Sequence, residues 1–279
     1  SALAGEVYRA DGFQVFRELI SPTEAAHLAG ELSRISGLQA NDHSAVRAGR
    51  RSAFYRHGGI AANPSLWPLL LHPRVIAAVA ETLDGPPKCL PGIDTIGMHA
   101  SEIDAHRDVS PSELPALAQT PFEPGHPVTR MILYPNSPGE RFGCLPGSHR
   151  QARRPRDVAE AASDAWRWVV LRSGDALVFD PRLIHAGAPI TNPKPMVITT
   201  YGVDGPGALQ TYFHARIKTA QLGFADAPAQ LLHLLASRGL LLHGVTEQAN
   251  WEHCSTVWPD HATSAAQFTD VAERRAEAR

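Results

Sequence analysis

The stretch that decides the fold is GDALVFDPRLIHAGAP, residues 174–189. Within it, DALVFD alternates small or apolar residues in the manner of a half-buried β-strand. Just before it, RSGD (172–175) predicts a tight turn that joins this strand to the preceding apolar run, WRWVVL. Two more short apolar runs broken by proline and glycine, VTRMILYPN (128–136) and KPMVITTYG (194–202), also predict strands. The pattern favours a β-barrel or a double-sheet jelly roll.

A helix is predicted ahead of this β-rich region, over LISPTEAAHLAGELSRISG (19–37). Ser21 is placed to cap the N-terminus, Glu24 to close a capping box, and Gly37 to end the helix. Pro22 stands at the first helical position, and the apolar face consists of Ala25, Leu28, Leu32 and Ile35.

Further helical patterns flank the strands. HPRVIAAVAETLDG (72–85) has Pro73 near its start and Gly85 just past its end, and helical periodicity returns in 227–239 and in the charged tail 270–279. No internal repeat or linker divides the chain. We therefore expect one domain over 1–279, mainly β with flanking helices: a helical region over about 1–88, a jelly-roll core over about 89–219 and a helical region over about 220–279.

Composition limits the kinds of partner. The 26 Lys and Arg nearly balance the 28 Asp and Glu, which gives a formal net charge of -2. Nothing in this balance favours nucleic acid or a membrane surface, so we expect a small-molecule substrate. No feature of the sequence indicates an oligomeric state.

Cysteine usage bears on the compartment. The three cysteines, Cys89, Cys144 and Cys254, are far apart and odd in number, which suits a reducing cytoplasm better than a disulfide framework. The sequence has no apolar run long enough to span a bilayer and no basic-then-apolar leader. A cytoplasmic location is the expectation.

IDAHRDVS (103–110) holds the candidate chemistry. In a strand-to-loop context, His106 and Asp108 point to the same side and can chelate a metal. His185, at the end of the strand in the first stretch quoted, can supply a third ligand. Two histidines and one carboxylate leave half an octahedron open, as in non-haem Fe(II) oxygenases. The alternative from these residues alone is a hydrogen-bonded His106–Asp108 pair and a His185 that only caps a strand.

The order of several motifs resembles the phytanoyl-CoA dioxygenase family, and the resemblance covers most of residues 10–202. The motifs are DGFQVFRELISPTEAAHLAGEL (11–32), AHRDVS (105–110), GCLPGSHR (143–150) and GDALVFDPRLIHAGAP (174–189). The Pro-Gly-Ser-His segment and the Gly-Asp-strand-His-Ala-Gly segment are specific in combination.

This resemblance implies a double-stranded β-helix (jelly-roll) fold. It also implies Fe(II) held by His106, Asp108 and His185, with 2-oxoglutarate as cosubstrate and O2 as oxidant. Related halogenases lack the carboxylate ligand, whereas Asp108 is present. Hydroxylation, oxidative ring closure or desaturation of a small metabolite is therefore the implied reaction.

One departure from the family pattern concerns 2-oxoglutarate. Family members usually carry an arginine about eleven residues after the distal histidine, where it binds the far carboxylate. Met196 stands there. Arg130, the basic residue inside the apolar strand 128–136, is the first candidate for a replacement, because related Jumonji-type oxygenases place a lysine on the strand after the His-x-Asp motif. Lys194 is the second candidate, expected in a turn exposed to water, and a structural salt bridge is the alternative role for Arg130.

Two other function classes stay open. One is a non-catalytic jelly-roll binding protein that has kept the metal ligands, and the other is a cupin-type metal-dependent hydrolase or isomerase. The retained metal ligands oppose the first of these, and the absence of the extra histidine and glutamate common at cupin sites opposes the second. The missing arginine is the strongest argument against the oxygenase.

Other residues outside the candidate metal site also have expected roles. RAGRRSAFYRHGG (47–59) could bind an anionic or sugar-like substrate or form a solvated loop, and residues 109–127 suggest a lid. Trp166 and Trp168 should pack on one face as core or pocket wall. His149 is expected to form hydrogen bonds without binding the metal.

Overall fold

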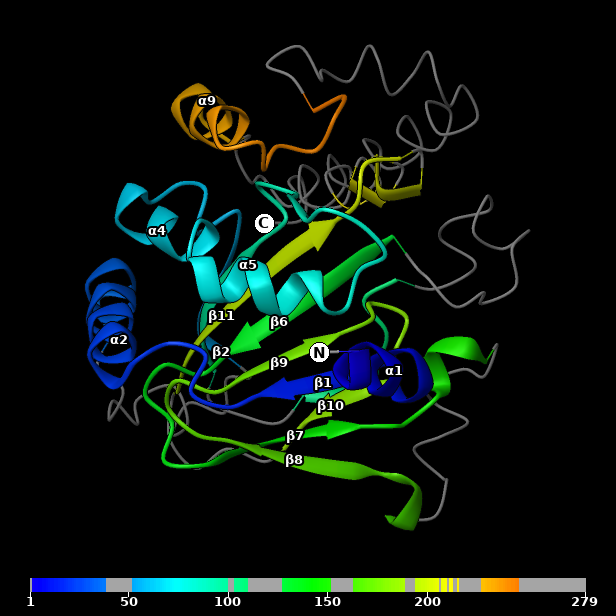
Figure 1. Ribbon diagram of the computed structural model, residues 1–279. Coiled ribbons are helices and arrows are strands. Elements are labelled where there is room, and N and C mark those ends of the chain that lie inside the picture. The colour runs from blue at the N-terminus through cyan, green and yellow to red at the C-terminus, as the bar shows by residue number, and fades with distance from the viewer. Residues whose placement is uncertain are drawn as a thin grey trace, which may run out of the picture.

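The computed structural model describes residues 2–38, 52–99, 103–109, 127–151, 163–188, 194–205, 207–209, 211–212, 215 and 227–245. Its β-strands form two antiparallel sheets that face each other, with helices around them (Figure 1). The predicted jelly roll with flanking helices is confirmed. The charged tail 270–279, most of the segment 109–127, and Arg47, Arg50 and Arg51 lie outside the described residues.

The larger sheet has seven strands in the order β1-β9-β6-β11-β4-β2, with β3 paired to β11. Three of the four predicted strands, at 128–136, 175–180 and 194–202, belong to it. Their bounds are β1 Phe13–Phe16, β2 Ser52–His57, β3 Lys88–Cys89, β4 Thr95–His99, β6 Val128–Leu133, β9 Ala176–Phe179 and β11 Lys194–Gly202.

The smaller sheet has four strands in the order β5-β10-β7-β8. These are β5 Ile103–His106, β7 Glu140–Cys144, β8 Arg167–Leu171 and β10 His185–Gly187. The predicted turn at 172–175 is present, with the Asp175 N–H donating to the Arg172 carbonyl oxygen at 2.9 Å. The strands that it joins, β8 and β9, lie in different sheets, so the chain crosses from one layer to the other here.

Strand β9 is buried at all four positions, so the prediction of a half-buried strand is wrong. One of its faces packs under the helices and the other faces the smaller sheet. Val178 belongs to the first of these cores, whereas Leu177 and Phe179 belong to the second. A strand covered on both faces loses the apolar–polar alternation that marks an exposed face.

The helices lie mainly over one face of the larger sheet, as Figure 1 shows for α2, α4 and α5. The capping box between Ser21 and Glu24 is present, and Gly37 ends α2 with a φ of 69°. The described helices are α1 Ala2–Asp11, α2 Pro22–Ser36, α4 Trp67–Leu70, α5 Pro73–Ala80 and α9 Ala229–Ser237, with 3-10 turns η1 Pro64–Leu66, η2 Ser148–Arg150 and η3 Ser163–Ala165.

Helix α5 ends at Ala80, whereas Gly85 was expected just past its end. The N–H of Thr82 donates to the Val79 carbonyl oxygen at 3.0 Å, and the Thr82 hydroxyl donates to the same oxygen at 2.8 Å. A threonine side chain that competes for a backbone carbonyl favours a tightened last turn over further helix.

Two cores follow from the alternation of side chains along the strands. On β6, Met131 and Leu133 pack under the helices, whereas Ile132 faces the smaller sheet. Since successive side chains point to opposite faces, Arg130 also faces the space between the sheets. The candidate ligand His185 contacts Phe142 and Phe179 in this same space.

The tryptophan prediction holds in part. The rings of Trp166 and Trp168 stack at 6.1 Å on one face, over Gly143, where a Cβ would come within 2.9 Å of the Trp168 ring. Trp168 is 36% exposed, so its assignment to a core or pocket wall is wrong. It lies on β8, where Trp168 and Val170 point to the exposed outer face of the smaller sheet and Val169 and Leu171 point into the core.

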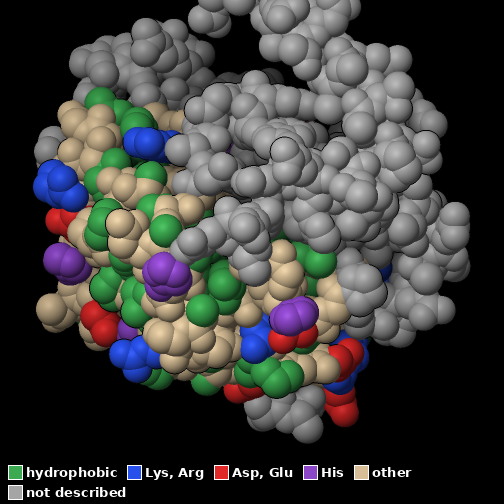
Figure 2. Space-filling model, turned by 90° about the horizontal axis from the view of Figure 1, so that it is seen from above, with side chains coloured by type: hydrophobic (Ala, Val, Ile, Leu, Met, Phe, Trp, Pro, Cys, Tyr) green, Lys and Arg blue, Asp and Glu red, His purple; other side chains and the backbone are tan. Residues whose placement is uncertain are grey.

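Figure 2 shows Lys and Arg interspersed with Asp and Glu among the described side chains of one face. Cys89 and Cys144 are buried and form no disulfide within the described part of the chain. Among the described helices, none combines the length and apolar character needed to cross a membrane.

Candidate metal centre

The three predicted ligands come together at the end of the smaller sheet. His106 ends β5 and His185 begins β10, and the two residues are direct partners in the antiparallel ladder, so both rings lie on the same face. The Nε2 atoms of His106 and His185 are 3.7 Å and 3.9 Å from the Asp108 Oδ1. One ligand atom from each residue lies within 4.8 Å of the others.

Hydrogen bonds orient both imidazole rings. The His106 Nδ1 is 2.8 Å from the Asp104 carbonyl oxygen, and the His185 Nδ1 is 3.0 Å from the Leu183 carbonyl oxygen. A carbonyl oxygen only accepts, so both Nδ1 atoms donate a hydrogen. The Nε2 lone pairs are therefore left to face Asp108, which is the arrangement that a metal requires. The donor set fits a divalent metal with open positions.

The electrostatics of the site match the same role. Burial lowers the pKa of His185 to about 4, so its ring is neutral at neutral pH. Burial alone raises the pKa of Asp108, but Arg130, His185 and His106 outweigh it and hold the pKa of that carboxyl well below its usual range. A neutral imidazole and an ionised carboxylate are the forms that bind metal.

Backbone contacts tie the ligand segments to each other. The N–H groups of Asp108 and Val109 donate to the Pro181 carbonyl oxygen, each at 3.0 Å. The Arg107 guanidinium donates to the carbonyl oxygens of Ser148 and Gln151 at 2.8 and 2.6 Å, and the Ser148 hydroxyl accepts from the Ile184 N–H at 2.8 Å. The GCLPGSHR segment therefore holds both ligand strands in place.

His149 of that segment lies apart from the metal ligands. It is buried, and its Nε2 donates to the Arg9 carbonyl oxygen at 3.2 Å. The group of metal-ligand atoms found in the described residues does not include it. This agrees with the expected role in hydrogen bonding.

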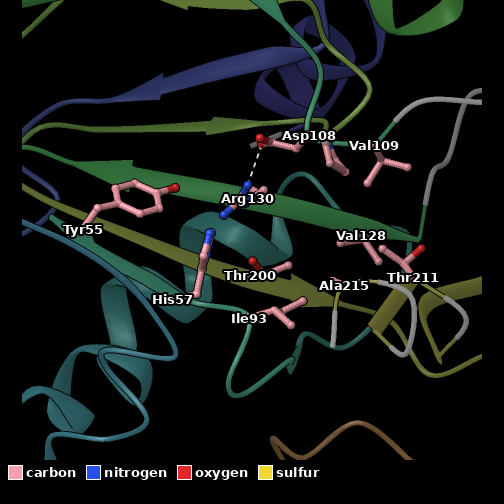
Figure 3. A pocket seen from close by; sticks show the side chains of 11 residues that line it. Tyr55, His57, Ile93, Asp108, Val109, Val128, Arg130, Thr200, Thr211 and Ala215 are labelled. Carbon is pink, nitrogen blue, oxygen red and sulfur yellow. Dashed lines mark ion pairs between the residues drawn. The ribbon is translucent and has the colours of Figure 1, made fainter. Parts of the chain in front are cut away.

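Arg130 contacts the site directly. Its Nη1 lies 2.7 Å from the Asp108 Oδ2, and its side chain is 14% exposed. Both residues line a cavity of about 220 Å³. In Figure 3, Arg130 lies between Thr200 and Asp108, and the dashed line marks its ion pair with Asp108. The other polar lining residues are Tyr55, His57 and Thr211, and the apolar ones include Ile93, Val109 and Val128.

Lys194 lies elsewhere, and the prediction that it is exposed in a turn is wrong. It is the first residue of β11, pairs with His99, and is only 4% exposed. Its Nζ is 3.2 Å from the Glu140 Oε2 and 4.1 Å from the centre of the Tyr134 ring. The described lining of the cavity does not include Lys194. Met196, two residues along, is 2% exposed in the apolar core between the sheets.

Sequence reasoning missed His57 and Thr200 as cavity residues. Alternation within SAFYRH places Tyr55 and His57 on one face of β2, and this signal was available. It could not tell that this face meets Arg130, because the two segments are joined only through β4 and β11.

The chain is similar to known proteins both in its sequence pattern and in its fold. The sequence model of the phytanoyl-CoA dioxygenase (PhyH) family matches residues 8–196. No curated protein matches this sequence. HygX from Streptomyces hygroscopicus, solved with nickel and 2-oxoglutarate, is 20% identical with a TM-score of 0.56, over 72% of this chain and 87% of that one.

Two enzymes of nogalamycin biosynthesis are similar as well. The non-haem alpha-ketoglutarate-dependent epimerase SnoN is 18% identical, with a TM-score of 0.54 over 72% of this chain and 79% of that one. The carbocyclase SnoK is 17% identical, with a TM-score of 0.52 over 73% and 85%. These likenesses establish the fold.

Proposed function

Because the chain belongs to the phytanoyl-CoA dioxygenase family, we propose that it is an Fe(II)- and 2-oxoglutarate-dependent oxygenase that acts on a small molecule. The observation that carries the proposal is the convergence of His106, Asp108 and His185, one ligand atom each within 4.8 Å. Both imidazoles have their Nδ1 hydrogens engaged by carbonyl oxygens. Three ligands of this kind leave metal positions open for other molecules.

The residues of the chain have separate tasks in this proposal. Fe(II), with 2-oxoglutarate and O2, supplies an oxidant strong enough to remove hydrogen from an unactivated carbon. His106 and His185 hold the metal through Nε2, and Asp108 holds it through Oδ1. The Phe142 ring stacks on His185 at 5.4 Å, and Phe179 lies 4.9 Å from it, so apolar surface shields this ligand from water.

Arg130 is proposed as the residue that binds the carboxylate of 2-oxoglutarate. It keeps Asp108 ionised and faces the cavity that adjoins the metal ligands. Lys194 remains the second candidate, but Glu140 already neutralises its charge. The family's arginine position is occupied by Met196, which cannot bind a carboxylate.

The proposed reaction begins with removal of a hydrogen atom from the substrate and continues as hydroxylation, ring closure or desaturation. SnoN is an epimerase and SnoK a carbocyclase, so similar folds support several outcomes. A binding protein that has kept the metal ligands is the second candidate function, because Met196 stands where the family usually has an arginine.

The test is a titration of anaerobic Fe(II) protein with 2-oxoglutarate, followed by exposure to O2. We expect a weak visible absorption band from keto acid chelation and then release of succinate. Asp108→Ala should abolish both signals, whereas Asp104→Ala, which removes an exposed carboxylate four residues earlier in the same segment, should keep them. Neither band nor succinate with the wild-type protein would favour the binding-protein alternative.

A further inference from the structure

The usual place for the far carboxylate of 2-oxoglutarate is closed to an anion in this chain. Met196 is 2% exposed and packs in the apolar core between the sheets, together with Ile132, Phe142 and Ile198. An ionised carboxylate among these side chains would lose its hydration without gaining a partner. A carboxylate that enters the barrel therefore needs another polar wall.

The cavity next to Asp108 provides such a wall on three strands of the larger sheet, the adjacent β6 and β11 and, beyond β4, β2. Thr200 on β11 is the direct ladder partner of Arg130 on β6. His57 lies on β2, and its ring points toward Arg130 in Figure 3. The His57 Nδ1 is 3.0 Å from the Thr95 hydroxyl oxygen, and the Tyr55 ring meets the His57 ring edge-on at 4.9 Å. These contacts fix the orientation of the imidazole.

Two polar atoms of this wall have no hydrogen-bond partner among the described residues. Thr200 is 3% exposed, and its Oγ1 is buried without a partner. The Arg130 Nε is also buried without a partner, although its Nη1 contacts Asp108. A buried group left unpaired costs free energy, and a ligand that supplies the missing partner recovers it. Both atoms belong to residues that line the same cavity.

The charges of the wall suit one carboxylate. Burial, and then the charge of Arg130, lower the pKa of His57 to about 4, so His57 is neutral at neutral pH. Arg130 is thus the only permanent cation among the described lining residues. One guanidinium, one neutral imidazole and one hydroxyl match a single carboxylate, which accepts several hydrogen bonds.

We propose that His57 and Thr200, together with Arg130, form a cradle for the distal carboxylate of 2-oxoglutarate. This inference rests on the proposed function and moves the carboxylate site from position 196 to the wall formed by β2, β6 and β11. His57 and Thr200 contact the carboxylate directly, and Thr95 positions the imidazole. The alternative source of a carboxylate at this wall is the substrate itself.

The experiment compares two keto acids of equal length that differ only at the far end. Anaerobic Fe(II) protein is titrated with 2-oxoglutarate and with 2-oxopentanoate, which lacks the distal carboxylate. Wild type should bind 2-oxoglutarate at least about 30-fold more tightly, because 2-oxopentanoate lacks the group that Arg130, His57 and Thr200 would contact. His57→Gln should weaken 2-oxoglutarate about tenfold, Thr200→Val about fivefold, and neither should change 2-oxopentanoate.

Matched controls lie on the opposite faces of the same strands. Arg56→Gln changes an exposed cation next to His57, and Thr199→Val changes the buried threonine next to Thr200 on the face that packs under the helices. Both should leave the affinity for each keto acid within about twofold. Fe(II) affinity and the unfolding midpoint show whether each variant keeps the site and the fold, and His57→Asn provides a second substitution.

The outcomes separate this inference from the proposed function. If wild type binds neither keto acid, the proposed function and the cradle both fail. If wild type binds both acids equally well, or if His57→Gln and Thr200→Val weaken both equally, the function stands and the cradle is overturned. Unchanged 2-oxoglutarate affinity in folded variants would also overturn it and would assign the wall to the substrate.

Discussion

Arg130 and Lys194 both face the space between the two sheets, and each is paired with a carboxylate, yet their surroundings differ. The partner of Arg130 is Asp108, a metal-ligand candidate, and both residues border a cavity. The partner of Lys194 is Glu140, and the Tyr134 ring covers the Lys194 ammonium group at 4.1 Å. Around Lys194, the described side chains satisfy the charge, whereas around Arg130 they leave the Nε unpaired.

This difference shows that a buried cation alone does not identify a binding site. A ligand needs space and an unsatisfied hydrogen-bonding group, because a charge already paired and covered gains little from a second anion. The Arg130 region has both features, and the Lys194 region resembles a structural ion pair between the sheets.

The largest effect is expected at the candidate metal site, where Asp108 is also the ion-pair partner of Arg130. His185→Ala should weaken Fe(II) binding by at least about 100-fold, since loss of a direct ligand should exceed the loss of a supporting contact. His149→Ala, which removes another buried histidine, should leave Fe(II) binding nearly unchanged. Fe(II) titration monitored by protein fluorescence provides the measurement, and normal binding by the His185 variant would disprove the ligand assignment.

The difference between the Arg130 and Lys194 regions is tested by substituting each of these two residues. Arg130→Ala should lower 2-oxoglutarate affinity by about 30-fold or more, because a bidentate arginine–carboxylate contact is lost. Lys194→Ala should change it by less than about threefold. Anaerobic titration of the Fe(II) protein measures both, and the reverse ranking would move the carboxylate site to Lys194.

The structural role of Lys194 predicts a stability pattern. Lys194→Met should cost about 2 kcal/mol of unfolding free energy, because Glu140 loses its partner while partly buried. The double variant Lys194→Met with Glu140→Gln should recover most of that loss, since neither charge remains. Urea unfolding of the metal-free protein provides the values. A double variant no more stable than the single one would show that the lost packing, and not the stranded charge, caused the effect.

The smallest effect concerns pH. Burial lowers the pKa of His57 from 6.5 in its unperturbed state to about 4 in the folded protein. As pH falls, His57 therefore takes up a proton in the unfolded chain before it does so in the folded protein. The contribution of His57 to the unfolding free energy is fully present above pH 6.5 and is lost between pH 6.5 and about 4. His57→Gln should make this decline less steep in metal-free protein, as measured by urea unfolding at several pH values. An unchanged slope would mean that His57 is already charged in the folded state.

Much of the fold was predictable because its signals are local. The Ser21–Glu24 capping box and Gly37 set the bounds of α2, and proline and glycine set those of β11. The convergence of His106, Asp108 and His185 was predictable for a related reason. His106 and Asp108 are neighbours in sequence, and His185 lies in a motif whose family resemblance supplied the third position.

Other features depended on what the tertiary structure brings into contact. The burial of Lys194 depends on Glu140 and Tyr134, which lie more than fifty residues away in sequence. The wall of His57, Arg130 and Thr200 combines three distant strands, and β9 is fully buried because both sheet faces are covered. The sequence by itself determined the local caps, the strand periods and the ligand types. Only the fold decided which polar groups remain unpaired near Asp108, because pairing depends on contacts between residues that no local pattern links.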